Sequence, residues 1–229
     1  MRTRRVKPAG VTSSAAMKLS DPNRDYRPLI RRTYDQIAAE FNRTRVLESP
    51  DELAPLLEVL APGSTVLDLG CGSGVPIAKA LAASHNVIGV DLSAGQLANA
   101  LTQVPNAQFL QGDMSRCCFR PGSFDAVVSF YAIFHTPLSE HAPLIARIGE
   151  WLRPGGYFLA TLSPNREEGY TEDDFFGAEM FWSNLSLPEY RDVLASSGFE
   201  ILSETIVGHG YSNDNARPEH HPLVFARRA

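Results

Sequence analysis

The sequence predicts a single α/β domain in which a mostly parallel sheet is covered by helices on both faces. Segments with strand and helix patterns alternate between residues 65 and 162, and this βαβα order is typical of a doubly wound, Rossmann-like sheet. A glycine-rich turn, Gly70-Cys71-Gly72-Ser73-Gly74, follows the first predicted strand of that series. The carboxyl edge of such a sheet, where this turn lies, is the usual place for a ligand.

Composition supports one globular domain. The chain has 229 residues, of which 44% are hydrophobic and 21% charged, which suffices for a sizeable core. The net charge of −5 argues against a general basic surface for nucleic acid. No apolar run approaches the roughly 18 residues of a membrane span. We therefore expect no nucleic-acid or membrane partner, and either a monomer or a homodimer.

The first residues differ from the rest of the chain. Residues 1–20 hold five basic residues and no acid, and they show little apolar periodicity. We expect a disordered basic tail over residues 1–22 and one domain over residues 23–229, with an Arg-rich transit segment as the alternative for the tail. The three cysteines, two of them adjacent, do not suggest a disulfide framework, so we predict a reducing, cytoplasmic location.

Each predicted element follows from a local pattern. Apolar residues at helical spacing predict helices, short apolar runs predict buried strands, and Ser93 and Ser186 can cap the helices that follow them. The predicted helices cover residues 26–41, 51–60, 75–83, 93–103, 139–152 and 186–197. The predicted strands cover residues 65–69, 86–90, 107–111, 124–130, 157–162, 199–207 and 222–226.

The glycine turn differs from a dinucleotide-binding fingerprint. That fingerprint is G-x-G-x-x-G, but Val75 occupies the place of its third glycine. The glycines occur instead as G-x-G-x-G, preceded by Asp68. Asp91 ends the next predicted strand, 21 residues after Gly70, where its carboxylate can accept both hydroxyls of a ribose. A packing turn, and a helix cap in the case of Asp91, are the alternatives without a ligand.

From about Tyr34 to Ala226 the chain resembles the class I S-adenosylmethionine-dependent methyltransferases. The motifs that carry the resemblance are the D-x-G-x-G-x-G turn, the acid at Asp91, Gly112-Asp113-Met114, and Leu152-Arg153-Pro154-Gly155-Gly156. The resemblance implies S-adenosylmethionine as the cofactor and a seven-stranded sheet whose last strand is antiparallel. It also implies that Asp91 holds the ribose, that Asp113 accepts from the adenine amine and that Met114 packs on the adenine ring.

The cofactor contacts that this resemblance implies come from the ends of successive strands and from a helix near the N-terminus. They are Tyr34, Asp68, Gly70, Cys71, Gly72, Gly74, Asp91, Leu92, Asp113, Met114, Ser129 and Phe130. Simple core packing is the alternative for Tyr34, and Cys71 is also small enough to serve as a packing residue. No metal site is expected, because neither Glu219-His220-His221 nor Cys117-Cys118 has suitable spacing.

The catalytic candidate lies at the end of the fourth predicted strand of the alternating series. Methyl transfer needs alignment, and it needs a proton acceptor when the nucleophile is a hydroxyl or an ammonium group. His135 has a suitable ordinary pKa, so we predict that it is the base, with packing beside the cofactor as the alternative. Tyr131 and Phe134 are predicted to contact the acceptor. His141, in the next helix, is expected at the surface.

Residues 164–185 interrupt the alternation with an acidic and aromatic segment. Such a length is unusual for a plain connection, so we predict that the segment roofs the acceptor pocket. Phe181 and Trp182 would supply aromatic faces there, which attract a sulfonium or a cationic acceptor. A satellite hydrophobic cluster under a long loop is the alternative.

The sequence thus predicts a methyltransferase that acts on oxygen or nitrogen of a small-molecule acceptor. The Asn/Asp/Ser-Pro-Pro-aromatic motif that is typical of DNA and protein-amide methylation is absent after the fourth strand. Two alternatives remain at this point. One is an NAD-linked oxidoreductase, and the other is a catalytically silent cofactor-binding subunit that supports a partner enzyme.

Overall fold

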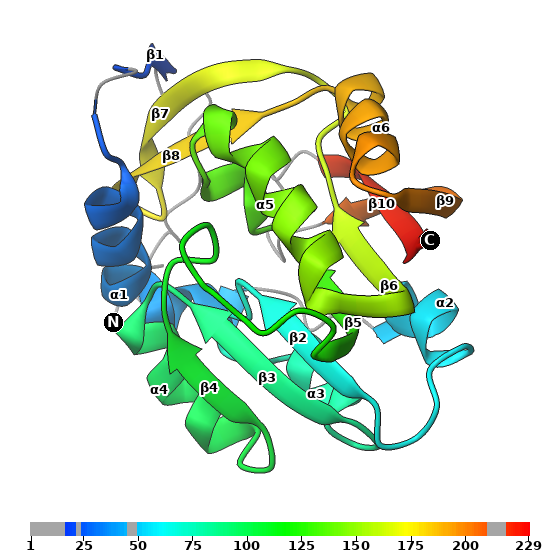
Figure 1. Ribbon diagram of the computed structural model, residues 1–229. Helices are drawn as coiled ribbons and strands as arrows, with labels where there is room; N and C mark the ends of the chain where they lie inside the picture. Colours follow the sequence, from blue (N-terminus) through cyan, green and yellow to red (C-terminus); the bar gives the residue numbers. More distant parts are fainter. Residues whose placement is uncertain (1–16, 22–23, 45–49, 210–218) are drawn as a thin grey trace.

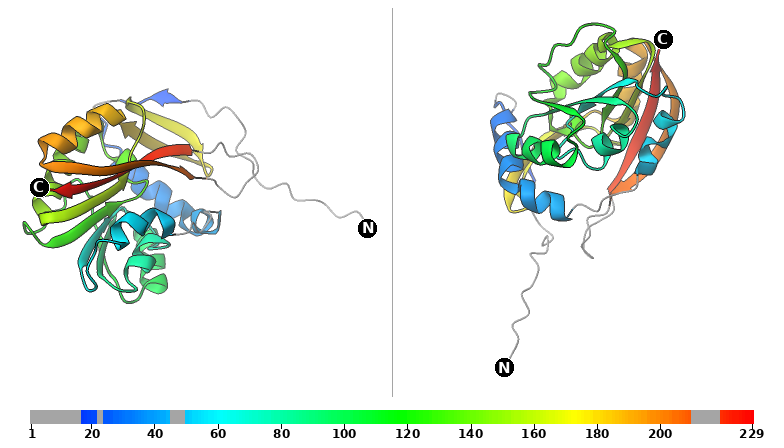
Figure 2. Two further views of the ribbon diagram at one scale, coloured as in Figure 1. Left: turned by 90° about the vertical axis from the view of Figure 1, so that its right-hand side faces the viewer. Right: turned by 90° about the horizontal axis from the view of Figure 1, so that it is seen from below.

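The computed structural model describes residues 17–21, 24–44, 50–209 and 219–229. Figure 1 shows one layered α/β unit, and Figure 2 shows the same unit from two further sides. Residues 1–16 and 22, which make up most of the predicted tail, and residue 23 lie outside the described residues. No helix in the described part of the chain is both long and apolar enough to cross a bilayer.

The centre of the fold is one seven-stranded sheet. Its strands are β2 (Thr65–Leu69), β3 (Asn86–Asp91), β4 (Gln108–Gln111), β5 (Phe124–Ser129), β6 (Leu152–Thr161), β9 (Phe199–His209) and β10 (Glu219–Arg228). Their spatial order is β4-β3-β2-β5-β6-β10-β9. The pairs from β4 to β6 are parallel, whereas β10 is antiparallel to both of its neighbours. This confirms the predicted sheet, including its antiparallel last strand.

Helices cover both faces of this sheet, as predicted (Figures 1 and 2). The helical elements are α1 (Arg27–Thr44), η1 (Pro50–Leu53), α2 (Ala54–Leu57), α3 (Ile77–Leu81), α4 (Ala94–Gln103), η2 (Ile133–His135), α5 (Leu138–Trp151) and α6 (Leu187–Ser196). Alternate residues of β2 enter different cores, because neighbouring side chains of a strand point to opposite faces. Leu67 packs with residues of α5 and α6, whereas Val66 packs with residues of η1, α2 and α3.

The segment predicted as a roof is a β-hairpin. Its strands, β7 (Glu167–Phe175) and β8 (Ala178–Asn184), form a three-stranded sheet with β1 (Lys18–Leu19). Both residues of the hairpin tip, Phe176 and Gly177, have positive φ, 53° and 78°, as a two-residue type I′ turn requires. A phenylalanine occupies the position where Asn or Asp is usual, so the sequence carried no hairpin signal there. β1 lies inside the range that was predicted as a tail.

Other element boundaries also differ from the prediction: the helix predicted over 51–60 is the short pair η1 and α2, and β10 is longer than residues 222–226. α3 covers only Ile77–Leu81, which is shorter than the predicted helix over 75–83. The Arg153–Gly156 segment was predicted as a turn, but it belongs to β6. Leu152 pairs with Phe124 and Tyr157 pairs with Ala126, so the residues between them bulge out of the ladder.

Candidate active site

The loops that follow β2, β3, β4 and β5 meet at one edge of the sheet, as expected for parallel strands. Gly70, directly after β2, donates its N–H to Val90 O at 2.8 Å. A side chain on Gly70 would place its Cβ 2.1 Å from Ala132 Cβ. The loop after β5 can therefore lie this close to the glycine turn only because Gly70 has no side chain. Met114, after β4, is also next to this point, with its Cε 3.2 Å from the same Cβ position.

The three glycines of the turn have different surroundings. All have positive φ, between 54° and 77°, a region that glycine occupies without strain. A Cβ on Gly74 would lie 3.0 Å from Val104 Cγ2, whereas a Cβ on Gly72 would meet no heavy atom within 4 Å. Gly70 and Gly74 therefore allow neighbouring side chains to pack closely against the turn. At Gly72 no protein atom covers the turn, so a ligand can approach its backbone there.

Asp91, at the end of β3, holds the glycine turn in place. Its Oδ2 accepts the N–H of Gly72 and its Oδ1 accepts the N–H of Ser93, both at 2.8 Å. Burial raises the pKa of Asp91 to about 6, although these two backbone hydrogen bonds oppose the shift. A carboxylate offers about four acceptor positions. Positions that the backbone does not occupy remain for the hydroxyls of a ribose, so the residue fits the proposed contact.

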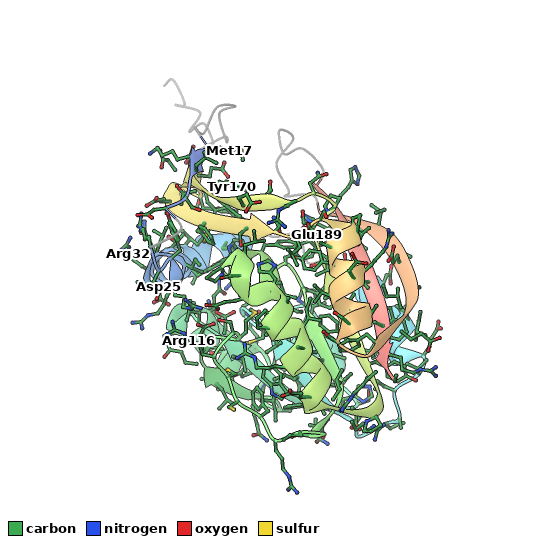
Figure 3. The ribbon with its side chains drawn as sticks, turned by 45° about the horizontal axis from the view of Figure 1, so that its top comes forward. Met17, Asp25, Arg32, Arg116, Tyr170 and Glu189 are labelled. Carbon is green, nitrogen blue, oxygen red and sulfur yellow. The ribbon has the colours of Figure 1, made fainter. Side chains whose placement is uncertain are left out.

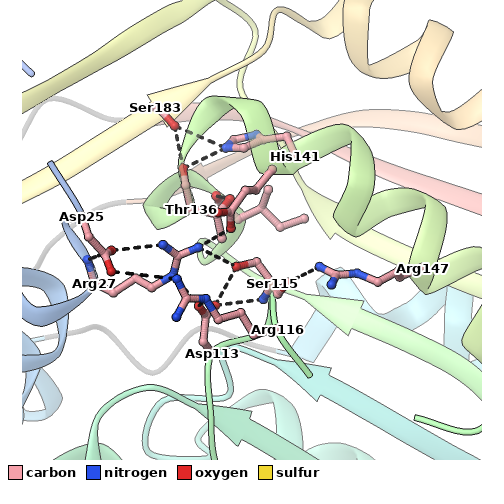
Figure 4. Close-up of polar contacts among 11 residues, drawn as sticks. Asp25, Arg27, Asp113, Ser115, Arg116, Thr136, His141, Arg147 and Ser183 are labelled. Carbon is pink, nitrogen blue, oxygen red and sulfur yellow. Dashed lines mark hydrogen bonds and ion pairs between the residues drawn. The ribbon is translucent and has the colours of Figure 1, made fainter. Parts of the chain in front are cut away.

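Asp113, after β4, contacts protein groups in the site. Its Oδ1 accepts the N–H and the hydroxyl of Ser115 at 2.9 and 2.8 Å, and its Oδ2 accepts Nε–H of Arg27, a residue of α1. Figure 4 shows these contacts. Arg116 Nε also lies 3.5 Å from Oδ2, so an adenine amine would compete with this guanidinium for the last acceptor position of the carboxylate.

The remaining predicted cofactor contacts differ in their access to this edge. Asp68, Ser129, Cys71 and Phe130 are buried, and Ser129 donates its hydroxyl to Leu69 O at 3.0 Å. Leu92 is half-buried and packs with residues of α1 and β8. Burial raises the pKa of the Cys71 thiol, and the carboxylates of Asp68 and Asp91 act in the same direction. Cys71 therefore stays a neutral thiol, which agrees with a packing function.

Tyr34 and His135 form a hydrogen-bonded pair between α1 and the end of β5. Tyr34 Oη lies 2.8 Å from His135 Nε2, and His135 Nδ1 lies 2.8 Å from the carbonyl oxygen of Phe181 in β8. A carbonyl only accepts, so Nδ1 carries the proton, and Nε2 accepts the proton of the Tyr34 hydroxyl. Burial lowers the pKa of His135 to about 4, against the effect of its hydrogen bond to Phe181. The imidazole is therefore neutral at pH 7, and its lone pair faces Tyr34.

Aromatic rings surround this pair. The ring of Trp182 lies 5.8 Å from that of His135, and the ring of Phe175 lies 6.1 Å from that of Tyr34. Phe181 is different, because it is buried and stacks on Tyr26 with 4.3 Å between the ring centres. Neighbouring residues of a strand point to opposite faces. Of the two acceptor contacts predicted in the hairpin, only Trp182 therefore has its ring beside Tyr34 and His135.

Tyr131 and Phe134 lie in a second aromatic group at the same edge. Tyr131 has φ of 54°, an uncommon value for a bulky residue that often marks functional sites. Its N–H donates to Thr161 Oγ1 at 2.6 Å. Its ring and that of Phe134 lie 5.3 and 5.0 Å from the ring of His221 in β10. The sequence pattern around His221 indicated only a poor metal motif.

The structure adds two residues of α1 to the site, Arg27 and Asp35. Asp35 Oδ1 accepts the hydroxyl of Ser93 at 2.7 Å and the N–H of Gly95 at 2.9 Å, which attaches α1 to the N-terminus of α4. Nothing in the local sequence distinguishes these two residues from the exposed charged residues of the same helix. Tyr34, their neighbour on the helix, carried the only usable signal.

The expectation that His141 lies at the surface is wrong. Its side chain is 0% exposed. Its Nδ1 lies 2.7 Å from Tyr190 Oη, and its Nε2 lies 3.1 Å from Thr136 O. Ser183 of β8 approaches the same Nε2, as Figure 4 shows. The first turn of α5 is covered by α6 and by the β7–β8 hairpin, which was not predicted from the sequence.

The buried His141 is expected to make the protein sensitive to acid. Burial lowers the pKa of His141 from 6.5 to about 4. Between pH 6.5 and pH 4, His141 therefore binds a proton in the unfolded chain but not in the folded chain. This difference removes about 3 kcal/mol of stability as the pH falls from 6.5 to 4. In His141→Gln the free energy of unfolding, measured in urea, should change less over this interval. His220→Gln, at an exposed position, is the control, and an unchanged pH dependence in His141→Gln would contradict the assignment.

Comparison with known proteins agrees with this geometry. Residues 66–156 match a family model described as a methyltransferase domain. Trans-aconitate 2-methyltransferase of Deinococcus radiodurans is 38% identical over 109 residues, which are 46% of this chain and 40% of that protein. (+)-O-methylkolavelool synthase of Herpetosiphon aurantiacus is 30% identical over 157 residues, 62% of this chain and 53% of that protein. The chain thus spans about half or less of these two relatives.

Solved structures show the same fold. 1,6-Didemethyltoxoflavin-N1-methyltransferase of Burkholderia thailandensis, solved with 1,6-didemethyltoxoflavin and S-adenosylhomocysteine, superposes with a TM-score of 0.70 at 19% identity. The superposition covers 98% of this chain and 100% of that one. The matched domain, the strand order and the glycine turn after Asp68 identify residues 66–156 as a methyltransferase domain and support a class I, S-adenosylmethionine-dependent enzyme.

Proposed function

We propose that this chain transfers a methyl group from S-adenosylmethionine to oxygen or nitrogen of a small-molecule acceptor. The observation that carries the proposal is the hydrogen-bonded series from Tyr34 through His135 to the Phe181 carbonyl. It lies at the sheet edge where the loops after β2 to β5 meet, and it can take up a proton. Small-molecule methyltransferases among the similar proteins agree with an acceptor of this class.

The cofactor would be held at the glycine turn and at Asp91. The outer side of Gly72 is open, so a ligand can approach the backbone there. Asp91 would accept ribose hydroxyls at the positions that the backbone leaves open. Tyr34, Leu92, Asp113 and Met114 are proposed as further contacts, and the Asp113 carboxylate would accept the adenine amine. S-adenosylmethionine supplies the electrophilic methyl group on its sulfonium.

Tyr34, rather than His135, would receive the acceptor's proton first. The lone pair of His135 Nε2 is directed to the Tyr34 hydroxyl, so this nitrogen does not face an acceptor directly. The Tyr34 oxygen can accept a proton from an acceptor hydroxyl or ammonium while its own proton moves to His135 Nε2. Both ring nitrogens of His135 are then protonated, and Nδ1–H still donates to the Phe181 carbonyl. His135 is thus the final base of a two-residue relay.

Burial by itself opposes a positive charge on His135, as its lowered pKa shows. The transfer of the methyl group removes the positive charge of the sulfonium in the same reaction. The net charge of the enclosed site is therefore unchanged when His135 gains its proton. Trp182 and Phe175 beside the pair would exclude water and favour a cation throughout.

The acceptor is proposed to lie between the relay and the second aromatic group. Tyr131 and Phe134 would contact it from the β5 side and Trp182 from the hairpin side. Phe181 is proposed to act through its carbonyl oxygen, because its ring packs on Tyr26. This arrangement favours an acceptor with an apolar or flat body next to the hydroxyl or amine that is methylated.

Calorimetric titration and an acceptor screen with isotope-labelled methyl donor test the proposal. We expect binding of S-adenosylhomocysteine, no binding of NAD, and transfer of label to at least one hydroxyl or amine compound. Binding of the cofactor without transfer to any member of a broad panel would favour the silent-subunit alternative. Transfer to protein or nucleic acid, with none to small molecules, would contradict the proposed acceptor class.

A further inference from the structure

Arg27 occupies the first position of α1, where a cation is electrostatically unfavourable. The N-terminus of a helix carries a partial positive charge that favours acidic residues, yet the first turn of α1 contains no acid. The residue also lies well inside the molecule, since its side chain is only 12% exposed. Contacts outside the helix must therefore hold the guanidinium at this place.

Those contacts use four of the five N–H groups of the guanidinium. Nε donates to Asp113 Oδ2, and Nη1 donates to Asp25 Oδ1 at 3.0 Å. Nη2 donates to Ser115 Oγ at 3.1 Å and to Glu140 Oε2. Figure 4 shows Arg27 between Asp25 on one side and the loop with Asp113 and Ser115 on the other.

The acids around Arg27 come from separate segments of the fold. Asp25 precedes α1, Asp113 follows β4, and Glu140 is in the first turn of α5. Asp113 and Glu140 are partly withdrawn from water, with exposed fractions of 14% and 32%. Arg27 thus joins the start of α1 to the loops at two strand ends.

The same helix carries the first residue of the proposed relay. Tyr34 follows Arg27 by seven residues, or about two turns, so both side chains lie on one face of α1. Asp35 attaches α1 to Ser93 and Gly95, after β3. α1 is therefore attached after β3 through Asp35, after β4 through Arg27, and after β5 through Tyr34. Of these attachments, the one through Arg27 involves full charges on both sides.

We propose that Arg27 is a positioning residue for methyl transfer, which fixes α1 through Asp113 and Glu140 so that Tyr34 stays bonded to His135. This inference rests on the proposed function, because it concerns the relay described there. The planar fork of arginine can contact several acceptors at once, whereas a lysine ammonium acts as a point charge and cannot reproduce this geometry. Loss of the guanidinium removes the counter-charge that Asp113 and Glu140 share. Asp113 then keeps only its longer contact with Arg116, whose Nε lies 3.5 Å from Oδ2, and the start of α1 is displaced.

Arg27→Gln and Arg27→Lys test the inference, with Arg32→Gln as the matched control. Arg32 is an exposed arginine of the same helix, and Figure 3 labels it. A displacement near 1 Å can cost about 100-fold in rate. We expect kcat to fall about 10- to 100-fold in Arg27→Gln and to a similar extent in Arg27→Lys, with the acceptor KM nearly unchanged. Arg32→Gln should retain the kcat of the unsubstituted protein.

Two measurements without turnover separate positioning from general stability. Hydrogen exchange of the α1 amides should be faster in both Arg27 variants. The 15N chemical shift of His135 Nε2 should lose the signature of an accepted hydrogen bond, while urea unfolding remains cooperative. If Arg27→Gln fails to fold, Glu140→Gln removes one carboxylate from the cluster and serves for the same measurements, with a smaller loss expected.

Several results would overturn the inference. An unchanged kcat in a folded Arg27→Gln variant would overturn it. Faster hydrogen exchange of the α1 amides in this variant, with an unchanged 15N shift of His135 Nε2, would also overturn it. A loss confined to S-adenosylhomocysteine affinity would instead make Arg27 a cofactor-site residue. If the unsubstituted protein methylates no acceptor, the proposed function fails. The His135 signal would then still report whether Arg27 positions Tyr34.

Discussion

Replacement of Tyr34 by phenylalanine is expected to lower kcat by about 10²- to 10⁴-fold, the usual effect of removing a general acid or base. The substitution removes one oxygen and leaves the ring among Phe41, Phe175 and His135. The acceptor's proton then has no path to His135 Nε2. Cofactor affinity should change little, because the ring still packs at the same place. Steady-state kinetics and calorimetry with S-adenosylhomocysteine measure the two quantities.

Tyr26→Phe is the matched control for this experiment. Tyr26 belongs to the same hydrophobic cluster, but its hydroxyl accepts the N–H of Asp21 at 2.8 Å instead of contacting His135. His135→Ala should lower kcat to a similar extent, and the double variant should lose little more, because both residues act in one relay. Additive losses would contradict a shared relay. A loss below tenfold in Tyr34→Phe would leave the residue a packing function only.

Replacement of Asp91 by alanine is expected to weaken S-adenosylhomocysteine binding by about 10²- to 10⁴-fold. Each hydrogen bond to a charged group contributes about 1.5–3 kcal/mol, and two ribose hydroxyls are involved. The glycine turn also loses its attachment, because Asp91 accepts the N–H of Gly72. Calorimetric titration measures the change in affinity. An unchanged affinity would show that the ribose is held elsewhere.

The raised pKa of Asp91 adds a pH dependence to the same measurement. Since the carboxyl titrates near pH 6, it is ionised at pH 7.5 and mostly protonated at pH 5. S-adenosylhomocysteine affinity should therefore decrease as the pH falls through 6, and the decrease should be smaller in Asp91→Asn. Asp125→Asn is the control, because Asp125 also accepts a backbone N–H, from Thr65, at the opposite edge of the sheet. A decrease of the same size in Asp91→Asn would assign the titration to another group.

Local patterns were sufficient for the sheet, and they placed the carboxyl ends of β2, β3 and β4 within one residue. β2 was predicted as residues 65–69 and is observed at the same residues, because a short apolar run between Pro62-Gly63 and the glycine turn has no other stable arrangement in this fold. The same holds for Asp91, which ends β3, and for Asp113, which lies two residues after the end of β4. Parallel strands bring their carboxyl ends together, so the order of elements already placed these acids at one edge.

Contacts between distant segments could not be predicted in this way. Arg27 and Asp35 lie 86 and 58 residues from the partners they hold, Asp113 and Ser93, and nothing near them in the sequence distinguishes them from surface charges. His141 was misplaced for the same reason, since the hairpin that covers it was not predicted. The tautomer of His135 depends on a carbonyl oxygen in β8.

The sequence by itself determined the doubly wound sheet, the family, and the acids and glycines available for a cofactor, because hydrophobic periodicity and turn chemistry act over a few residues. Only the tertiary structure decided which side chains face one another. In the folded protein the ring of Phe181 packs on Tyr26, and the lone pair of His135 faces Tyr34. Arg27 pairs with Asp113 and Glu140. Such pairings depend on how α1 and the β7–β8 hairpin pack over the sheet edge, and packing between distant segments leaves no local pattern in the chain.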